Sequence, residues 1–347
     1  MLKPYNKAEV TFDIIKEIGQ DGRNSQAYIC KDHQLDAIIV IKKMEKSKFS
    51  SLVNFFDESK CLYASSHPNV VQIHYACEDA DSIYLAMPYY RNGSLKDLIC
   101  NRFLSVREIL VFGCQILSGL HNIHSKNLIH FDIKPDNILL SDRNEALVSD
   151  FGQSKQTNLS GVAAQDRLYS KMTPPEATQT DHFTYTFDIY QFGLTLYRMC
   201  VGNAAFEAQF SAFVTAGNLD RDGFRFALCN ARFPDRTALP AHIPAALQKI
   251  IKCCLETDPK DRYPSANAVA NAMASIDGAH LDWSYALTPN QRKWTKDVSG
   301  VQYEFIVDKD SKSTCYKTAQ GGQRRRVVDA CKDAMTEREV RKILGTY

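Results

Sequence analysis

Two short polar strings limit what this chain can fold into. Residues 130–137 read HFDIKPDN, and residues 150–152 read DFG. Asp132 and Asn137 therefore stand five positions apart in one loop, and Asp150 follows in a second loop. Carboxylate and amide oxygens are ligands that Mg²⁺ accepts in proteins. We expect a fold that brings the two loops together at one metal-binding cleft.

The predicted secondary structure changes character once along the chain. Short runs rich in β-branched and aromatic residues predict five strands at 10–18, 26–32, 37–44, 70–77 and 81–87. A helix is expected at about 50–65. From about 95 to 275 the apolar spacing is mainly helical. Strands followed by helices favour an α+β fold with a small antiparallel sheet over alternating βα units.

Composition agrees with this fold and argues against several functions. The 347 residues are 24% charged and 44% hydrophobic, an ordinary balance for a two-lobed domain with a small appendage. The net charge of +2 provides no global field for nucleic acid or a membrane surface, and no apolar run approaches bilayer length. The eleven cysteines show no paired C-x-x-C pattern and the chain starts without an export signal, so we expect reduced thiols in the cytoplasm.

Further residues stand in a fixed order around the two polar strings. The β-branched run 37–42 ends in Lys42, and a His-Pro-Asn turn follows at 67–69. Together these features resemble the eukaryotic-type (Hanks-type) protein kinases over about residues 13–275. The resemblance implies a two-lobed kinase fold with an N-lobe at 13–87, a hinge at 88–93 and a C-lobe at 94–275, followed by a small appendage at 276–347.

The chemistry that this resemblance implies is phosphoryl transfer from ATP, with Mg²⁺ as the cation and Mn²⁺ as a second possibility. Asp132 would accept the hydroxyl proton of the acceptor, and Lys134 would neutralise charge on the departing phosphoryl group. Asn137 and Asp150 would ligate the metal.

A lysine and its carboxylate partner complete the expected catalytic set. Lys42 would hold a phosphate, and Glu58, nine residues before His67, would pair with Lys42. A solvated helix charge is the alternative for Glu58. The residues expected to carry catalysis are Lys42, Glu58, Asp132, Lys134, Asn137 and Asp150.

The nucleotide loop departs from the family pattern. Gly22 and Ser25 align with the second and third glycines of the glycine-rich turn, but Gly19 fits the first only with one inserted residue. Backbone amides can still face phosphate in such a turn, because Gly22 can adopt a positive φ and Ser25 is small. We expect the broken glycine spacing to lower the affinity for ATP or to increase the mobility of the loop.

The resemblance also places an adenine slot and a hinge. Val40 stands where alanine is usual, and Met87 is the gatekeeper. Pro88 lacks an amide proton, but its carbonyl can accept while the Tyr90 amide donates. The residues expected to bind the nucleotide are Gly19, Gly22, Ser25, Ala27, Val40, Lys42, Met87, Pro88 and Tyr90.

Two features of the expected lower lobe are structural and regulatory. Glu176, which closes the activation loop, is expected to pair with Arg262. Phe131 stands where regulated members of the family place an arginine before the catalytic aspartate. Without that cation a phosphorylated loop loses its usual partner, so we expect activity that does not require loop phosphorylation.

The acceptor is predicted from the catalytic loop. Lys134, two residues past Asp132, resembles the serine/threonine branch, so serine and threonine hydroxyls of proteins are expected, including those of the chain itself. Tyr169 stands where threonine is usual, which keeps a dual-specificity or tyrosine kinase as an alternative. A pseudokinase scaffold and a small-molecule phosphotransferase are two further alternatives.

The last seventy residues contain no motif that predicts a catalytic role. Residues 294–298 and 301–307 alternate around a Ser-Gly turn and predict a hairpin, and a capping box at 336–339 predicts a helix, which gives a ββα-like appendage. The basic patch of Arg324, Arg325 and Arg326 is interpreted as solvated or docked on the lower lobe, with nucleic acid the less favoured partner. The irregular nucleotide loop and the short tail resemble a bacterial or prophage-borne kinase.

Overall fold

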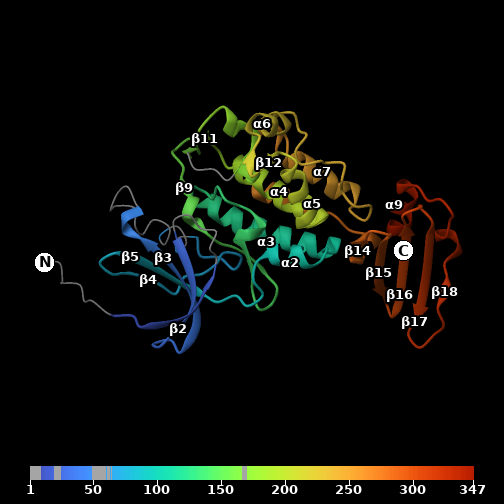
Figure 1. Cartoon of the computed structure of the whole chain (residues 1–347), viewed down its shortest axis with the longest axis horizontal. Helices are drawn as coiled ribbons and strands as arrows, with labels where there is room; N and C mark the ends of the chain where they lie inside the picture. The colour runs from blue at the N-terminus through green and yellow to red at the C-terminus, as the bar shows by residue number, and fades with distance from the viewer. Residues whose placement is uncertain (1–8, 19–24, 49–59, 61–62, 64, 166–169) are drawn as a thin grey trace.

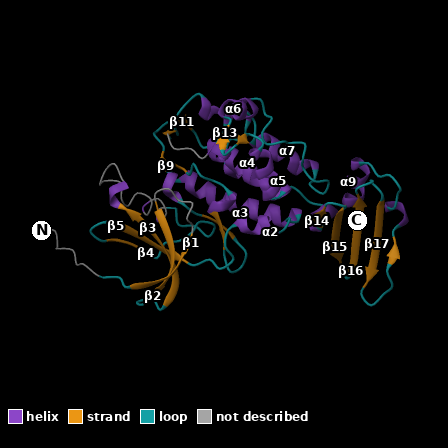
Figure 2. Cartoon of the chain, in the orientation of Figure 1, coloured by secondary structure: helices purple, strands orange, loops and turns teal. Residues whose placement is uncertain are grey.

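The structure is a computed structural model that describes residues 9–18, 25–48, 60, 63, 65–165 and 170–347. Figure 1 shows a small sheet at the N-terminal end, a body of helices in the middle and a second sheet at the C-terminal end. In Figure 2 the long helices lie between the two sheets. The predicted α+β fold is confirmed.

The N-terminal sheet has five antiparallel strands in the order β1-β2-β3-β5-β4. Their bounds are β1 (Phe12–Ile18), β2 (Ser25–Asp32), β3 (Ala37–Glu45), β4 (Tyr75–Glu78) and β5 (Ser82–Pro88). β3 is central and pairs with both β2 and β5 along its length. Its β-branched residues fit a pleated, half-buried surface.

The strand predicted at 70–77 begins only at Tyr75. The His74 amide already donates to the Ala86 carbonyl of β5 at 2.8 Å, but residues 69–71 bond to the lower lobe instead of to the sheet. The Val71 amide donates to the Val148 carbonyl at 2.9 Å, and the Val148 amide donates to the Asn69 carbonyl at 2.9 Å. This segment therefore ties the sheet to the helical lobe.

The helical lobe is built around two buried helices. α3 (Val106–Ser125) starts at a capping box formed by Ser105 and Glu108 and buries its apolar residues at helical spacing. α4 (Thr186–Val201) is buried from its second residue onward. The remaining helices are α2 (Leu95–Asn101), α5 (Asn203–Ser211), α6 (Arg221–Cys229), α7 (Ala245–Cys254) and α8 (Ala266–Ala274). Across the described residues no helix combines the length and apolarity needed to cross a bilayer.

Short antiparallel strand pairs position the loops of this lobe. They hold residues that are far apart in sequence at fixed separations, so the loops between them are constrained at both ends. The pairs are β6 (Leu128–Ile129) with β9 (Lys155–Gln156), β7 (Ile138–Leu140) with β8 (Ala146–Val148), β10 (Ala163–Ala164) with β11 (His182–Phe183), and β12 (Val214–Thr215) with β13 (Asn218–Leu219).

The C-terminal appendage contains the predicted hairpin and the predicted helix, and the hairpin is part of a larger sheet. The sheet is an antiparallel meander of β14 (Ser284–Thr288), β15 (Gln291–Val298), β16 (Val301–Asp308), β17 (Ser313–Ala319) and β18 (Arg325–Arg326). α9 (Glu337–Thr346) begins at the predicted capping box. The appendage has its own core, in which Trp283, Trp294 and Phe305 are fully buried.

Several contacts fix the appendage to the helical lobe. Trp294 Nε1 donates to His242 Nδ1 at 3.2 Å, and Arg107 Nη2 donates to Asp282 at 2.9 Å. Burial lowers the pKa of His242 to about 3, so this ring is neutral and can accept the indole hydrogen bond. In the basic patch, Arg324 bonds to Glu304, so part of that charge is satisfied within the sheet.

Candidate active site

One face of the N-terminal sheet carries the residues expected to lie above the nucleotide. Antiparallel pairing sets Ala27 opposite Lys42 and Val40 opposite Met87. Because side chains alternate along a strand and paired residues share a face, these positions lie on one side of the sheet. Ser25, two residues before Ala27, belongs to the same face. The Lys42 side chain shows that this face is turned toward the DFG loop.

Lys42 and Asp150 form a direct ion pair. Lys42 Nζ lies 2.8 Å from Asp150 Oδ1, although the residues are 108 positions apart in sequence. Asp150 has a left-handed backbone (φ 62°), and its side chain also accepts from the Gly152 amide. The Lys42 ammonium beside Asp150 holds the pKa of that carboxyl well below its ordinary value. Asp150 is therefore expected to carry a negative charge at neutral pH.

The catalytic loop gathers three of the predicted residues around one carboxylate. Asp132 Oδ2 accepts from Lys134 Nζ at 2.9 Å and from Asn137 Nδ2 at 2.7 Å. Asn137 Nδ2 also donates to the Asp132 carbonyl at 2.9 Å. Asp132 Oδ1 is buried and has no hydrogen-bond partner within the described residues. A substrate hydroxyl is a suitable partner for this second oxygen, because a buried acceptor without a bond costs free energy.

Helix α4 supports the catalytic loop through hydrogen bonds from two of its side chains. The Asp188 carboxylate accepts from the backbone amides of His130 and Phe131, each at 2.8 Å. Gln191 accepts from the Ile133 amide at 2.9 Å and donates to the Phe131 carbonyl at 3.0 Å. These bonds stabilise the left-handed backbone of Phe131 (φ 65°), a conformation that is costly for a bulky residue.

Ser149 and His130 connect the two loops. Ser149 Oγ donates to the Asn137 carbonyl at 2.9 Å, and His130 Nε2 lies 3.1 Å from the Ser149 carbonyl. The His130 and Phe151 rings meet edge to face at 5.0 Å. Burial lowers the pKa of His130, which favours a neutral ring that donates to this carbonyl. The loops predicted to share one cleft are therefore fixed to each other.

The donor groups fit a magnesium ion that is also held by phosphate. The amide nitrogen of Asn137 is used by Asp132, which leaves its Oδ1 as the oxygen available to a cation. Asp150 supplies a carboxylate. Across the described residues no group of three or more His, Cys, Asp or Glu could hold a metal alone. Mg²⁺ commonly binds through one or two carboxylates and substrate phosphates, so this sparse set suits it.

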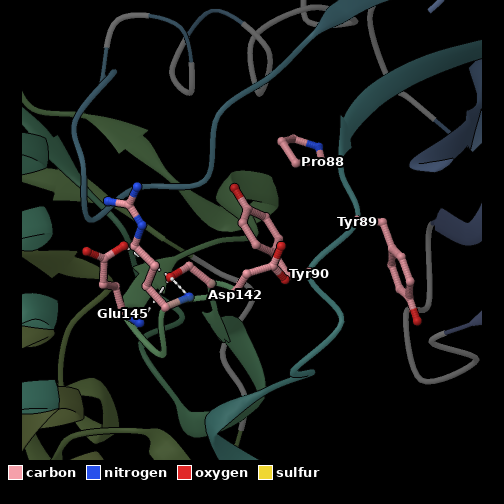
Figure 3. Close-up of a pocket in the computed structure, with 7 residues that line it drawn as sticks. Pro88, Tyr89, Tyr90, Asp142 and Glu145 are labelled. Carbon is pink, nitrogen blue, oxygen red and sulfur yellow. Dashed lines mark hydrogen bonds between the residues drawn. The ribbon is translucent and has the colours of Figure 1, made fainter. Parts of the chain in front are cut away.

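The linker between the lobes runs from the end of β5 to the N-cap of α2 at Ser94. Figure 3 shows Tyr90 lying toward Asp142 while Tyr89 points away from it. Beside the linker lies a hollow of about 260 Å³ lined by Pro88, Tyr89, Tyr90, Ser141, Asp142, Arg143 and Glu145. None of the expected catalytic residues lines this hollow, so it is separate from the catalytic centre.

Three of the predicted site residues lie outside the described part of the chain. They are Glu58, Gly19 and Gly22. The remaining predicted residues occupy the sheet face, the linker, the catalytic loop and the DFG loop as given above.

The predicted pairing of Glu176 with Arg262 is confirmed. Arg262 binds the Glu176 carboxylate through two nitrogens at 2.8 and 2.6 Å. The Arg262 side chain is fully buried, and its guanidinium lies 4.7 Å from the Tyr190 ring centre. This pair fixes η6 (Pro175–Thr178) against the start of α4, because Arg262 also donates to the Thr186 carbonyl at 3.0 Å.

Gln191 and Ser149 are functional positions that the motifs did not predict. Gln191 follows Asp188 by three positions in a helix whose neighbouring residues are mostly apolar. That spacing places both polar side chains on one helix face, which was the signal available in the sequence. Ser149 carried no signal, because a serine before a loop is common for many reasons.

Comparison with known proteins agrees with this geometry. A family model described as the protein kinase domain matches residues 12–273. A probable serine/threonine-protein kinase of Clostridium acetobutylicum is 27% identical over 278 residues, which cover 78% of this chain and 40% of that protein. The serine/threonine-protein kinase PrkC of Bacillus subtilis is 24% identical over 329 residues, covering 91% of this chain and 49% of PrkC. The tyrosine-protein kinase csk-1 of Caenorhabditis elegans is 32% identical over 165 residues, covering 46% of this chain and 31% of csk-1. The chain thus spans less than half of the length of these relatives.

Proposed function

Because the chain belongs to the protein kinase family, we propose that it transfers the terminal phosphoryl group of ATP to serine and threonine hydroxyls of proteins. The observation that carries this proposal is a pair of charged centres on two loops that are hydrogen-bonded to each other. The Lys42–Asp150 ion pair forms the first, and Asp132 with Lys134 and Asn137 forms the second. Phosphoryl transfer depends mainly on positioning and on charge neutralisation, and both are supplied by these side chains.

Each residue has a distinct task in this proposal. Asp132 orients the acceptor hydroxyl and takes its proton on Oδ1 as the oxygen attacks the phosphorus and the bond to ADP breaks. Lys134 keeps Asp132 in place and offsets negative charge on the transferred group. Lys42 positions the phosphates. Bound Mg²⁺, held by Asn137 and Asp150, would supply further neutralisation of phosphate charge.

Serine and threonine are the proposed acceptors for two reasons. Lys134 lies 2.9 Å from the Asp132 carboxylate, so the cation typical of the serine/threonine branch is in contact with the proposed proton acceptor. Two of the relatives described above are named serine/threonine kinases. The tyrosine kinase among the relatives makes tyrosine the second candidate acceptor.

Labelled ATP tests this proposal directly. The protein is incubated with [γ-³²P]ATP, Mg²⁺ and a generic protein acceptor, beside the Asp150→Ala variant and an Asp310→Ala control in the exposed turn after β16. We expect phosphoserine and phosphothreonine on the acceptor and on the chain itself, with label lost only in Asp150→Ala. Phosphotyrosine alone would change the acceptor class. An unlabelled acceptor would favour a scaffold, or a small-molecule phosphotransferase if aminoglycosides were labelled instead.

An apolar cluster supports activity without loop phosphorylation. Phe131 is 1% exposed, and its ring meets those of Phe183 and Phe187 edge to face at 5.9 and 4.9 Å. β9 and β10, which follow the DFG loop, are also tied to the lobe by their pairing with β6 and β11. Apolar packing and backbone pairing do not depend on a phosphate. We propose that the part of the loop around β9 and β10 is held in place in the unmodified chain.

Alanine at Ser160, Tyr169, Ser170 or Thr173 is therefore expected to leave turnover within about twofold of the native value, because neither the packing of Phe131 nor the two strand pairs requires a phosphate on these side chains. Tyr169 lies outside the described residues. The measurement is kcat for each single variant at saturating ATP. A loss of tenfold or more in kcat without a rise in the KM for the protein acceptor would contradict the proposal, because a docking role would raise that KM.

The proposed location is the cytoplasm. The cysteines within the described residues are all free thiols, and ATP at useful concentrations is found inside cells. Self-phosphorylation and protein acceptors in the same compartment belong to this proposal.

A further inference from the structure

One buried side-chain amide on α4 joins the catalytic loop to a segment near the end of the activation loop. Gln191 Oε1 accepts from the Ile133 amide at 2.9 Å, and Gln191 Nε2 donates to the Phe131 carbonyl at 3.0 Å. The same nitrogen donates to the Met172 carbonyl at 3.3 Å. Met172 is the last residue of η5 (Ser170–Met172). Gln191 therefore bridges the catalytic loop and η5 through backbone atoms of both.

The donor capacity of this amide is fully used. A side-chain amide has two donor hydrogens and one acceptor oxygen, and here two carbonyls take the hydrogens while a backbone amide takes the oxygen. Gln191 is 1% exposed, so water cannot replace these bonds when one of them is lost. A change at this side chain that removes its donors would leave two carbonyls without a partner, which is costly in a buried place.

Ion pairs also hold the two segments to neighbouring helices. On the side of the catalytic loop, Lys96 Nζ donates to Asp136 Oδ1 at 2.7 Å. On the side of η5, Lys171 Nζ donates to Glu207 Oε2 at 2.5 Å. Arg198 Nη2 lies 3.6 Å from Asp136 and 3.9 Å from Glu207. The two lysines and the two carboxylates are partly exposed, so water and salt screen these pairs. Screened pairs between long side chains fix a backbone spacing less strictly than one buried amide does.

η5 lies close to the position proposed for the acceptor hydroxyl. Phe131 immediately precedes Asp132, whose buried Oδ1 has no partner within the described residues and is the proposed proton acceptor. The carbonyl oxygens of Phe131 and Met172 are no further apart than the two bonds to Gln191 Nε2 laid end to end. A polypeptide that brings its hydroxyl to Asp132 is therefore expected to run close to η5.

We propose that Gln191 is a positioning residue for the protein acceptor: its amide sets the spacing between the catalytic loop and η5, and thereby the presentation of the acceptor hydroxyl to Asp132. None of its three bonds needs a phosphate, so the spacing is present in the unmodified chain. ATP binding is expected to be independent of this amide, because Lys42 and Asp150 act from β3 and from the DFG loop. This inference rests on the proposed kinase activity and assigns one further residue to it.

Gln191→Glu tests the donor function with almost no change in shape. The carboxylate can still accept from the Ile133 amide, but it cannot donate to the carbonyls of Phe131 and Met172 and is repelled by both. We expect the KM for a protein acceptor to rise at least about tenfold, because two buried bonds are lost, while the KM for ATP stays within about twofold of the native value. Gln191→Met, which introduces no charge, should raise the acceptor KM in the same way.

The pH dependence of Gln191→Glu separates acceptor positioning from a general loss of structure. Burial disfavours the charged form of a carboxyl group, so the introduced glutamate takes up a proton closer to neutral pH than an exposed glutamate does. The Asp188 carboxylate on the same helix favours this uptake, and the charge of Arg198 opposes it. The protonated form can donate to one of the two carbonyls. We expect the acceptor KM of Gln191→Glu to fall toward the native value as the pH is lowered from about 8 to about 6, and that of Gln191→Met not to fall.

Gln248→Glu on α7 is the matched control. It makes the same chemical change and removes an amide donor from the Ile243 carbonyl, so its acceptor KM should equal the native value at every pH. An acceptor KM within about twofold of native in either Gln191 variant, an equal rise in the KM for ATP, or no recovery at low pH would overturn the inference alone. Failure of both Gln191 variants to fold in a urea titration would also overturn it, because Gln191 would then serve folding. If the native protein phosphorylated no protein, the proposed function would fall and this inference with it.

Discussion

Replacement of Asp132 by asparagine is expected to lower kcat by about 10²–10⁴-fold, the range over which a positioned proton acceptor contributes to catalysis. Asparagine has nearly the same shape, so the loop should keep its fold. Its amide cannot take the hydroxyl proton, and it removes the negative charge that Lys134 and Asn137 now bind. The loss should appear in turnover, with the affinity for ATP nearly unchanged.

The measurement is single-turnover and steady-state transfer of labelled phosphate, together with nucleotide binding by fluorescence or calorimetry. Asp310→Asn in the exposed turn after β16 is the matched control, because it makes the same chemical change away from the cleft. If Asp132→Asn retained more than a tenth of native turnover, Asp132 would not be the proton acceptor. A parallel loss of ATP binding would instead assign it to the nucleotide site.

Local spacing made much of this site predictable. Asp132, Lys134 and Asn137 lie within six consecutive residues, so a single loop must bring them together whatever the rest of the chain does. Lys42 required more: a β-branched run predicted the strand, and strand alternation then fixed the face from which the lysine projects. The ion pair with Asp150 connects residues 108 positions apart and was not predicted. The partner predicted for Lys42 was Glu58, which lies outside the described residues.

Charged groups that are assembled from distant elements were not predictable in this way. Lys96, Asp136, Glu207 and Lys171 each look like solvated charges in the sequence, because nothing local shows that they meet. Arg198 offered the one signal, since it stands in a helix that is otherwise buried and must therefore have partners. That signal predicts a pair but does not name its members.

The predicted strand bounds were wrong where hydrogen-bond pairing, and not the apolar pattern of the sequence, decides where a strand begins. β4 starts late because the residues before it bond to Val148 in the other lobe. β14 and β18 are short or largely exposed, so they have no apolar alternation to detect, and hydrogen bonding to β15 and β17 defines them. The hairpin of β15 and β16 was predicted because Trp294, Phe305 and Val307 face a core and impose a period of two.

Removal of Arg262 is expected to have the largest effect on stability. Its side chain is fully buried and binds Glu176 twice, and it also donates to the carbonyls of Glu256 and Thr186. Arg262→Met would leave the Glu176 carboxylate, which is 15% exposed, without its cation. We expect the free energy of unfolding to fall by about 3–5 kcal/mol, the usual cost of breaking a buried ion pair from one side.

A double-mutant cycle separates the pair from its surroundings. Glu176→Gln alone should cost less than Arg262→Met, because the guanidinium keeps its bonds to backbone carbonyls. The double variant should lose less than the sum of the two, since neither partner is then left as an uncompensated charge. Urea unfolding of all four proteins gives these values, with Arg338→Met on the exposed side of α9 as the control. Strict additivity would show that the two groups do not interact, and the role of this pair in holding η6 against α4 would have to be abandoned.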